Sequence, residues 1–531
     1  MRSMLLLLLF SASGLFAEEL PWRKRQQAEF AALPRPDTLP RADVNGIDDF
    51  VAGYWRDKKH TPLPAVADEV FLRRVYLDIR GLAPTPDQLE AFRSNTAADK
   101  RAKVVEALLA DSTAYAEHSM TFWNDILRND EQTNIDGLRK PVTTWLYPAL
   151  LADRPVDEMV GQLLDPVPGG PDGYLKGVNW RGQVNASQTP PIQAAQNVAQ
   201  AFLSSSIKCA SCHNSFTNSW KLEQAYGLAS FFSAVNLQMH RCDAPTGRTV
   251  PPRFLFPELG TVPATADAKT RLKAVSRMVT SPKNPLFAKT IVNRVWKQLL
   301  GRGLFEPADD FDNAVVVHPA LLEWLAWDFM AHDYDLKYLR KLILTSGVYA
   351  QPADLGKSPA KGMPTLKGPI LRRLSAEQYV DGLCQVTGYW PKTATMAVAV
   401  ANPEIRAWRY KKPDALLSAL GRPNREQITT ERDPEASVVQ SLELVNGTAL
   451  AARLRSGAST LLDSPAGRVD SADVAVRTLY RAMLCRDASP GELAVARDLV
   501  GTPTTPRATR QAGWEDLLWI LSVHPDYAFI R

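Results

Sequence analysis

The chain has 531 residues, of which 45% are hydrophobic and 22% are charged, as in a soluble globular protein large enough for two domains. Lys and Arg number 62 against 57 Asp and Glu, and the basic residues are scattered along the chain. This charge pattern argues against a nucleic-acid partner, and five cysteines in so long a chain exclude a disulfide-rich scaffold.

The N-terminus has the pattern of a Sec-type signal peptide. Arg2 supplies a positive charge, Met4–Phe10 an apolar run, and Ser11–Ala17 a small-residue stretch that ends at the predicted cleavage site. The apolar run is far shorter than the ~20 residues that span a bilayer, and no later segment is long enough. We expect residues 1–17 to be removed and the mature chain to lie in the periplasm or another extracytoplasmic space, without a transmembrane span. An uncleaved N-terminal anchor is the alternative.

Helical periodicity begins after a proline-rich lead. Phe71 and Val75 mark the apolar face of a helix that Gly81–Pro84 ends. Thr85 and Gln88 predict a capping box, in which each side chain satisfies a backbone donor at the start of the next helix.

The middle of the chain alternates between loop and helix. Pro, Gly and Asn are frequent between Asp165 and Pro191, which predicts a long surface loop. Helical spacing returns over Ala194–Leu203, and this helix leads into Cys209. We expect a further helix over Leu222–Val235.

A segment rich in Pro, Thr and Gly, residues 244–265, lacks helical spacing and is the preferred domain boundary. We place a linker at 246–270, between a helical domain at 18–245 and a second helical domain at 271–531. We find no fixed-period repeat, no long alternating strand and no glycine-rich phosphate loop. The sequence therefore predicts a mainly α fold of two helical domains with long irregular connections.

The second domain shows clear helix ends. Leu286–Leu300 is expected to be a helix closed by Gly301 in a left-handed cap, and Ser375 with Gln378 predicts another capping box. His318–Pro319 has the pattern of a helix start.

Two polar clusters have simple structural interpretations. Residues 309–312 contain three aspartates that are able to bind calcium, but their irregular spacing favours a solvated helix-capping loop. Asp125 and Arg128 are three residues apart beside Trp123, which predicts a helical ion pair next to a buried ring.

The sharpest chemical signal is the C-x-x-C-H motif of Cys209, Cys212 and His213. This motif is typical of c-type haem attachment, in which both thiols add to the haem vinyl groups and the histidine binds the iron. The predicted export agrees with it, because haem is attached to thiols outside the cytoplasm. We expect one covalent haem c, anchored by Cys209 and Cys212, with His213 as the proximal ligand.

Two other interpretations of the motif stay open. A structural disulfide or redox-active pair needs neither the histidine nor a haem. A zinc site would use Cys209, Cys212 and His213 with Cys242 or His240 as the fourth ligand, although these last two lack a tight pair spacing of their own.

Spacing does not settle the distal haem ligand. Met239 and His240 follow one predicted helix later, and a Met thioether would raise the potential whereas a second His would lower it. His118 and Met120 are rival candidates, and an open position is also compatible. For each residue alone, a packing role is the simpler interpretation, with Met239 in the core and His240 at a helix end.

The chain resembles planctomycete-type exported proteins that pair a cytochrome-associated PSCyt domain with a PSD domain, catalogued as the domains of unknown function DUF1549 and DUF1553. The first domain's likeness is carried by Leu72–Asp78, Gly81–Pro86, Trp123, Asp125, Arg128, Cys209–His213, Trp220, Tyr226–Ala229 and Phe231–Phe232. The second domain's likeness is carried by Asn284–Pro285, Ile291–Trp296, Gly301–Leu304, Asp309–Phe311, His318–Pro319, Gly421–Pro423 and Leu444–Gly447.

This resemblance implies secretion and a haem-type motif without an established reaction. Relatives often carry a separate cytochrome c module, whereas this chain has a single C-x-x-C-H and so one haem at most. The chain also departs from the usual family pattern. Ser215 replaces a second histidine, Asn218 an acidic residue and Phe122 another histidine, and cysteines common near Thr429 and Thr430 are absent.

We therefore expect an exported c-type haem protein, either an electron carrier or the electron-accepting part of an oxidoreductase, with a periplasmic redox partner. The alternative is an exported scaffold or binding module with a structural disulfide or zinc site. A link of such a protein to polysaccharide degradation is a further hypothesis, suggested by the family resemblance. The sequence assigns no catalytic residue, substrate or oligomeric state.

Overall fold

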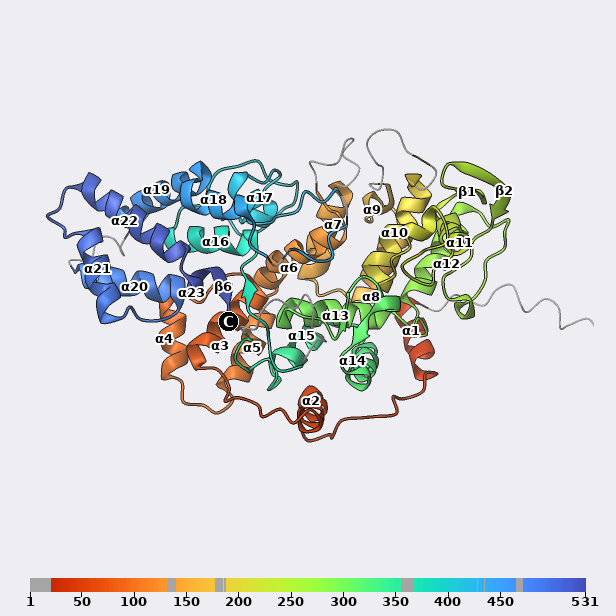
Figure 1. Ribbon diagram of the computed structural model, residues 1–531, viewed down its shortest axis with the longest axis horizontal. Helices are drawn as coiled ribbons and strands as arrows, with labels where there is room; N and C mark the ends of the chain where they lie inside the picture. Colours follow the sequence, from red (N-terminus) through yellow and green to blue (C-terminus); the bar gives the residue numbers. More distant parts are fainter. Residues whose placement is uncertain are drawn as a thin grey trace, which may run out of the picture.

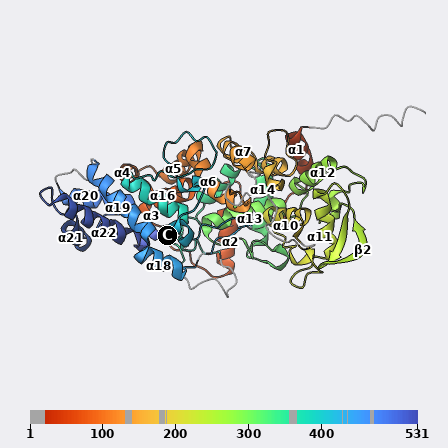
Figure 2. The ribbon, with the colours of Figure 1, turned by 90° about the horizontal axis from the view of Figure 1, so that it is seen from above.

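The computed structural model describes residues 21–130, 140–176, 185, 188–354, 366–426, 428–433, 435–464 and 471–531. The predicted signal peptide at 1–17 lies outside these residues. The described chain is mainly helical, with strands only in three two-stranded sheets, which confirms the predicted fold class. The molecule is elongated, with the C-terminal helices at one end and the β1–β2 hairpin at the other (Figures 1 and 2).

Helices of the first half end where the sequence predicts. Gly81 closes α3 with φ 71°, and the Thr85–Gln88 capping box opens α4. These helices are α1 (Trp22–Ala31), α2 (Gly46–Asp57), α3 (Asp68–Arg80), α4 (Pro86–Ser94), α5 (Lys100–Ala110), α6 (Ser112–Ile126), α7 (Lys140–Leu151), α8 (Val156–Leu164), α9 (Gly173–Lys176), α10 (Pro190–Leu203) and α11 (Leu222–Ala229).

The second half is a further succession of helices. Gly301 closes α13 with φ 80°, and Ser375 with Gln378 caps α16, as predicted. These helices are α12 (Ala268–Thr280), α13 (Phe287–Leu300), α14 (Pro319–Ala331), α15 (Leu336–Leu344), α16 (Ala376–Thr387), α17 (Ala415–Ala419), α18 (Val438–Asn446), α19 (Thr448–Asp463), α20 (Ala472–Leu484), α21 (Pro490–Val500), α22 (Arg507–Ser522) and α23 (Pro525–Ala528).

The helix expected over Leu222–Val235 is shorter than predicted. It ends at Ala229, and after a 3-10 turn the chain forms an antiparallel hairpin of β1 (Leu237–Arg241) and β2 (Ala244–Val250). Strand β2 is exposed along almost its whole length, so it lacks the apolar alternation that identifies a strand in a sequence. Met239 and His240 therefore lie on a strand, and the placement of His240 at a helix end was wrong.

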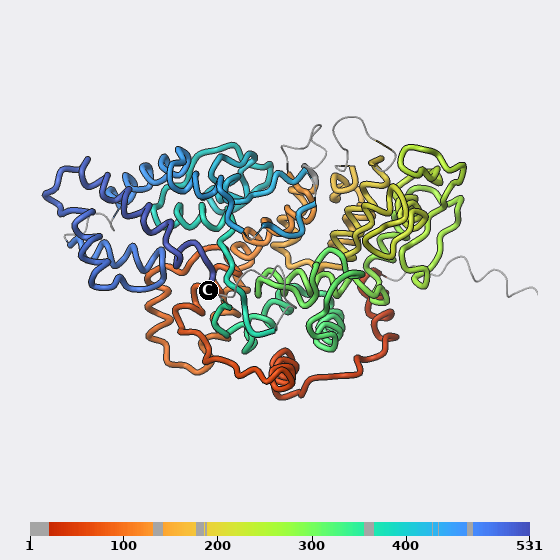
Figure 3. The backbone as a smooth tube through the Cα atoms, in the orientation of Figure 1, coloured from red at the N-terminus to blue at the C-terminus, as the bar shows by residue number. Residues whose placement is uncertain are grey.

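Two very short sheets complete the strands. The first pairs β3 (Phe305–Glu306) with β4 (Val315–Val316), and the second pairs β5 (Arg372–Arg373) with β6 (Phe529–Ile530). The β5–β6 pair joins the C-terminus of the chain to the segment before α16 (Figure 3).

Buried apolar residues form two clusters. The larger is built mostly from residues between Ile47 and Tyr349, joined by Leu366, Trp408 and Cys485. It includes Val250, Phe254 and Leu255, so part of the predicted linker is core. The smaller is built almost wholly from Leu374–Ile530. The segment before the predicted linker and the helices α12–α15 after it thus share one core.

Buried arginines on α3 tie the two clusters together. Arg73 donates to the carbonyls of Tyr527 and Phe529, and Arg74 donates to the carbonyl of Arg531. A third residue of the helix, Asp78, accepts two hydrogen bonds from Arg372 and one from the Tyr349 hydroxyl. The motif at 72–78 therefore attaches the first core to the C-terminal strand. Among the described residues, no helix has the length and apolar character needed to cross a membrane.

Candidate functional site

The C-x-x-C-H motif lies on one tight turn between α10 and α11. Cys209–Ser211 form a 3-10 turn, and the amides of Cys212 and His213 both donate to the Cys209 carbonyl, at 3.1 and 3.3 Å. Cys209 is exposed and Cys212 half-buried. Residues three apart on a 3-10 turn are aligned along it, so this backbone is compatible with two thiols on one side of the turn.

The His213 ring is held by the backbone of the next residue, Asn214. Its Nδ1 lies 2.8 Å from the Asn214 carbonyl oxygen, so a proton on Nδ1 donates to that oxygen and leaves Nε2 with a lone pair. The ring also lies 4.5 Å, centroid to centroid, from the ring of Phe216, which is 87% exposed. An imidazole fixed through Nδ1 is the usual arrangement for a histidine that binds metal through Nε2.

The loop after His213 is closed by local hydrogen bonds. The Ser215 hydroxyl accepts from the amides of Thr217 and Asn218, both at 3.2 Å, and Asn214 Oδ1 accepts from the Leu222 amide at 3.0 Å. Ser215 stands where the family resemblance implies a second histidine, and its hydroxyl stabilises the turn.

The three aspartates at 309–312 bind protein groups. Asp312 accepts from the Ser219 amide at 2.6 Å, Asp310 from Asn313 at 2.8 Å, and Asp309 from Arg294 at 3.1 Å. Asp312 thus holds the loop after His213, whereas Asp309 is bound to Arg294 of α13. In the described chain, no three His, Cys, Asp or Glu side chains are grouped as a metal site would need.

The β1–β2 hairpin brings a third thiol to the motif. The Cys242 amide donates to the Cys212 carbonyl at 2.8 Å, and Cys242, with φ 54°, lies at the turn between the two strands. Cys242 is exposed. The tertiary structure thus places next to the motif one of the two residues proposed as a fourth zinc ligand.

The proposed distal ligands differ in accessibility. Met239 is buried in the larger core, whereas His240 is half-buried and has Nδ1 3.0 Å from the Gln238 carbonyl oxygen. His118 lines a separate cleft, and Met120 is fully buried in the core. Of the four, His240 combines the position beside the motif with an accessible ring.

The residues fit a haem attached at the protein surface. Two thiols project from one turn, an anchored imidazole follows them directly, and the exposed Phe216 adds apolar surface beside it. Cys209 and Cys212 would hold such a haem and His213 would bind its iron. A haem so held supplies reversible one-electron transfer.

A cleft of about 300 Å³ lies between the two cores, and its lining includes His118, Phe122, Asp125, Thr430 and Arg432. At Phe122 and near Thr430 the family resemblance implies residues that this chain lacks. These departures, far apart in sequence, therefore meet in one cavity.

The predicted pair of Asp125 with Arg128 does not form. Asp125 instead accepts hydrogen bonds from Arg425 at 2.8 Å and from Arg432 at 2.7 Å. Arg128 lies just after the helix with φ 53° and donates to the Glu426 carbonyl. Arg432 also pairs with Glu377. Burial alone would raise the pKa of Glu377, but the surrounding arginines hold this pKa well below its usual range. Arg425 and Arg432 thus lie against α6, a contact that helical spacing cannot reveal.

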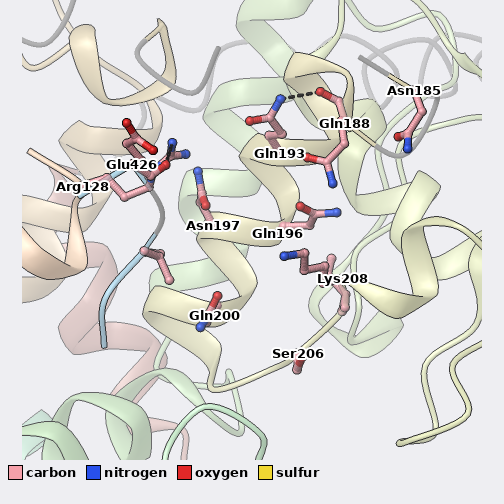
Figure 4. Close-up of a pocket in the computed structure, with 12 residues that line it drawn as sticks. Arg128, Asn185, Gln188, Gln193, Gln196, Asn197, Gln200, Ser206, Lys208 and Glu426 are labelled. Carbon is pink, nitrogen blue, oxygen red and sulfur yellow. Dashed lines mark hydrogen bonds between the residues drawn. The ribbon is translucent and has the colours of Figure 1, made fainter. Parts of the chain in front are cut away.

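Sequence reasoning missed a second cavity beside the motif. Polar residues of α10 line a groove that ends at Lys208, the residue before Cys209 (Figure 4). The signal that could have found it is the spacing of Gln193, Gln196, Asn197 and Gln200, a polar stripe along an otherwise apolar helix.

These features define a mainly α protein with two cores and a C-x-x-C-H turn between α10 and α11. Residues 46–237 match PSCyt2, described as a protein of unknown function (DUF1549), and residues 271–500 match PSD1, described as a protein of unknown function (DUF1553). The chain therefore belongs to the proteins that pair these two domains in this order. No curated protein and no solved structure matches the chain.

Proposed function

We propose that this chain is an exported c-type haem protein that carries electrons, or accepts them within a periplasmic oxidoreductase complex. The observation that supports it best is the arrangement of the turn: Cys209 and Cys212 lie three residues apart on one 3-10 turn, and His213 is fixed through Nδ1 at the Asn214 carbonyl oxygen, which leaves Nε2 for an iron. That arrangement provides two thioether anchors and one axial ligand.

The surroundings of the turn suit electron transfer at a surface. Cys209 is exposed and Phe216 is 87% exposed, so a haem attached here would lie near solvent and within reach of a protein partner. The loop that follows the turn is held by the Ser219 amide, which donates to Asp312, and by the Asn313 side chain, which donates to the Thr217 carbonyl. Rigid ligation keeps reorganisation on oxidation and reduction small.

His240 is the better distal candidate in this proposal. Its ring is half-buried, while the Met239 side chain would have to leave the core to reach an iron. Bis-histidine ligation would give a lower potential than ligation by histidine and methionine.

A zinc or disulfide clip is the second candidate, because the hairpin places Cys242 against Cys212. Cys209, Cys212 and His213 with Cys242 are a ligand set that zinc accepts, although among the described residues these side chains are not grouped around one point and would have to close on the ion. In that case the hairpin would be fastened to the turn by the metal and the protein would act as a scaffold or binding module.

The test is expression of the full chain with its own leader in a host that carries a c-type haem maturation system. We expect a protein heavier by one haem, a pyridine haemochrome spectrum of the c type, and a reducible Soret band. The His240→Ala variant is expected to change the distal-ligand bands, and Met239→Leu to leave them unchanged.

Controls separate the two candidates. The Cys209→Ala and Cys212→Ala variants should each lose the covalent attachment at one vinyl group, which mass spectrometry of the haem peptide detects. A colourless protein with one equivalent of zinc, or with an intact disulfide, contradicts the haem proposal. Recovery of the protein from the periplasmic fraction tests the export separately.

A further inference from the structure

The cleft between the two cores is lined by helices from distant parts of the chain. One wall is the face of α6 that carries His118, Thr121 and Phe122, and another is the end of α13 with Gln298. A third is formed by β5 and the start of α16. The volume of about 300 Å³ is that of a site for a small molecule, and the proposed haem chemistry makes no use of it.

Three polar side chains on the lining of this cleft have no partner within the protein. Among the described residues, the Thr121 hydroxyl, the Gln298 Nε2 and the His118 ring form no hydrogen bond. All three side chains are half-buried, and none of these atoms is sealed from the cleft. Each group is able to donate a hydrogen bond, so the cleft presents a set of donors to an acceptor.

Gln298 and His118 lie at the same end of the cleft. The Gln298 Oε1 accepts a hydrogen bond from Arg340, whose guanidinium lies 5.8 Å from the centroid of the Tyr115 ring. Tyr115 is three residues before His118 on α6. The contact with Arg340 fixes the carboxamide through its oxygen and leaves its NH₂ group as the donor. The fold itself therefore orients this donor.

The electrostatic potential at this end of the cleft is positive. The pKa of His118 is lowered to about 3, and burial is the largest cause. Three arginines add to the effect and Glu377 opposes it; the arginines are Arg406, Arg340 and Arg372. A potential that disfavours a charged imidazole stabilises a bound anion. His118 stays neutral at pH 7, with one ring nitrogen as a donor.

The carboxylates on the lining are already engaged. Three of the four pair with a cation that also lines the cleft: Asp78 with Arg372, Asp125 with Arg432 and Glu431 with Lys297. The fourth, Asp433, is exposed and accepts from the Glu435 amide. The lining also carries Arg373, which has no carboxylate within ion-pair distance among the described residues. The cleft therefore favours an anionic ligand over a cationic one.

We propose that this cleft binds a small monocarboxylate with an apolar body. Its carboxylate would accept hydrogen bonds from Gln298, Thr121 and His118, where the arginines make the potential positive. Its hydrocarbon part would lie against half-buried apolar side chains that share the lining: Phe122, Ile370, Leu371 and Leu420. Burial of that part contributes affinity, and the donors give selectivity for a carboxylate.

A sugar acid suits the cleft less well. Each ring hydroxyl that leaves water needs a hydrogen-bond partner, and the apolar side chains of the lining offer none. An inorganic anion would leave the same apolar surface uncovered. Preferential binding of a hydroxylated acid is therefore an outcome that would overturn the proposal.

The proposal does not depend on the haem. The lining of the cleft shares no residue with Cys209–His213 or with the β1–β2 hairpin. Binding is therefore expected in the full chain both with and without an attached haem. A failure of the haem proposal would leave this site standing.

The test is isothermal titration of the full chain with four monocarboxylates: benzoate, phenylacetate, hexanoate and octanoate. The comparison probes are phenylacetamide, which is neutral, hexylamine, which is a cation, and galacturonate, which is a hydroxylated acid. We expect at least one monocarboxylate to bind, and each comparison probe to bind at least tenfold more weakly or not at all.

Two variants remove donors with little change of shape. Gln298→Glu keeps an oxygen for Arg340 but replaces the donor with a negative charge, so it should weaken binding at least tenfold. Thr121→Val removes only the hydroxyl and should weaken binding severalfold. The matched control is Gln238→Glu, which makes the same change of charge at an exposed residue of β1 and should leave binding unchanged.

Thermal unfolding of each variant checks that it is folded. If Gln298→Glu is unfolded, Thr121→Val carries the test. The proposal would be overturned by no binding of any monocarboxylate at millimolar concentration, or by equal binding of phenylacetamide or hexylamine. Tighter binding of galacturonate, or binding that both variants retain in full, would overturn it as well.

Discussion

The amide of Cys242 donates a hydrogen bond of 2.8 Å to the carbonyl oxygen of Cys212. This bond joins the turn of the β1–β2 hairpin to the C-x-x-C-H turn, although thirty residues of chain separate them. It places a third thiol, and the strand that carries Met239 and His240, beside the motif.

The first prediction concerns this third thiol. Because the hydrogen bond uses the Cys242 backbone, Cys242→Ser should keep the hairpin in place and retain covalent haem in full. Mass spectrometry and the haemochrome spectrum measure this. Loss of one bound zinc in Cys242→Ser would instead identify Cys242 as a metal ligand.

The second prediction concerns Arg271, which holds the segment leading into the hairpin. Its buried guanidinium donates to the carbonyls of Ser230, Ser233, Ala264 and Ala266 and to the side chain of Asn236. A lysine cannot reach all five acceptors.

We expect Arg271→Lys to lower the free energy of unfolding by about 3 kcal/mol, the net value of one or two hydrogen bonds to a charged group. It should also expose the hairpin to limited proteolysis. Arg497→Lys, at an exposed site, is the control and should behave as wild type. An Arg271→Lys protein as stable as wild type would contradict the prediction that Arg271 holds this segment in place.

The third prediction concerns the buried ion pairs of Asp125. Removing its charge leaves Arg425, which is fully buried, without its 2.8 Å carboxylate contact. Asp125→Asn should therefore destabilise the fold by about 3–5 kcal/mol in denaturant unfolding. Asp463→Asn, which removes an exposed pair with Arg507, should leave the unfolding midpoint unchanged.

The fourth prediction concerns Gly81, which has φ 71° and leaves no room for a side chain. An added Cβ would lie 2.4 Å from His118 Nδ1. Gly81→Ala should cost about 2 kcal/mol or more in stability, because the conformation and the contact are both unfavourable. Gly53→Ala, inside α2 with open space around it, should stabilise by up to ~1 kcal/mol. Similar changes in the free energy of unfolding for Gly81→Ala and Gly53→Ala would contradict the prediction.

The fifth prediction concerns pH. Burial, with Arg406 and Arg340 adding to it, lowers the pKa of His118 to about 3 from an ordinary value of 6.5. The unfolded chain therefore binds this proton more readily than the folded protein, so stability falls as pH drops below 6.5 and continues to fall toward pH 3.

Between pH 7 and pH 5 the contribution of His118 is roughly 2 kcal/mol. Denaturant unfolding of wild type and His118→Gln at both pH values isolates it, because all other groups are common to the two proteins. A wild-type loss no larger than that of the variant would show that His118 has an ordinary pKa.

Local signals in the sequence determined the helices and the chemistry of the motif. Gly81, Gly301 and the two capping boxes act through backbone groups within a few residues, so their effect is present in the sequence itself. The spacing of Cys209, Cys212 and His213 is local in the same way. Its interpretation as a haem site stays a prediction.

Only the tertiary structure decided what lies around these elements. The partners of Asp125 come from some 300 residues away, Cys242 reaches Cys212 through a hairpin without apolar alternation, and the amides of α10 meet Arg128 and Glu426 across a groove. Each of these contacts depends on how the helices pack into the two cores. Helical periodicity identifies the face of a helix that is buried, but it carries no information on which distant segment will cover the other.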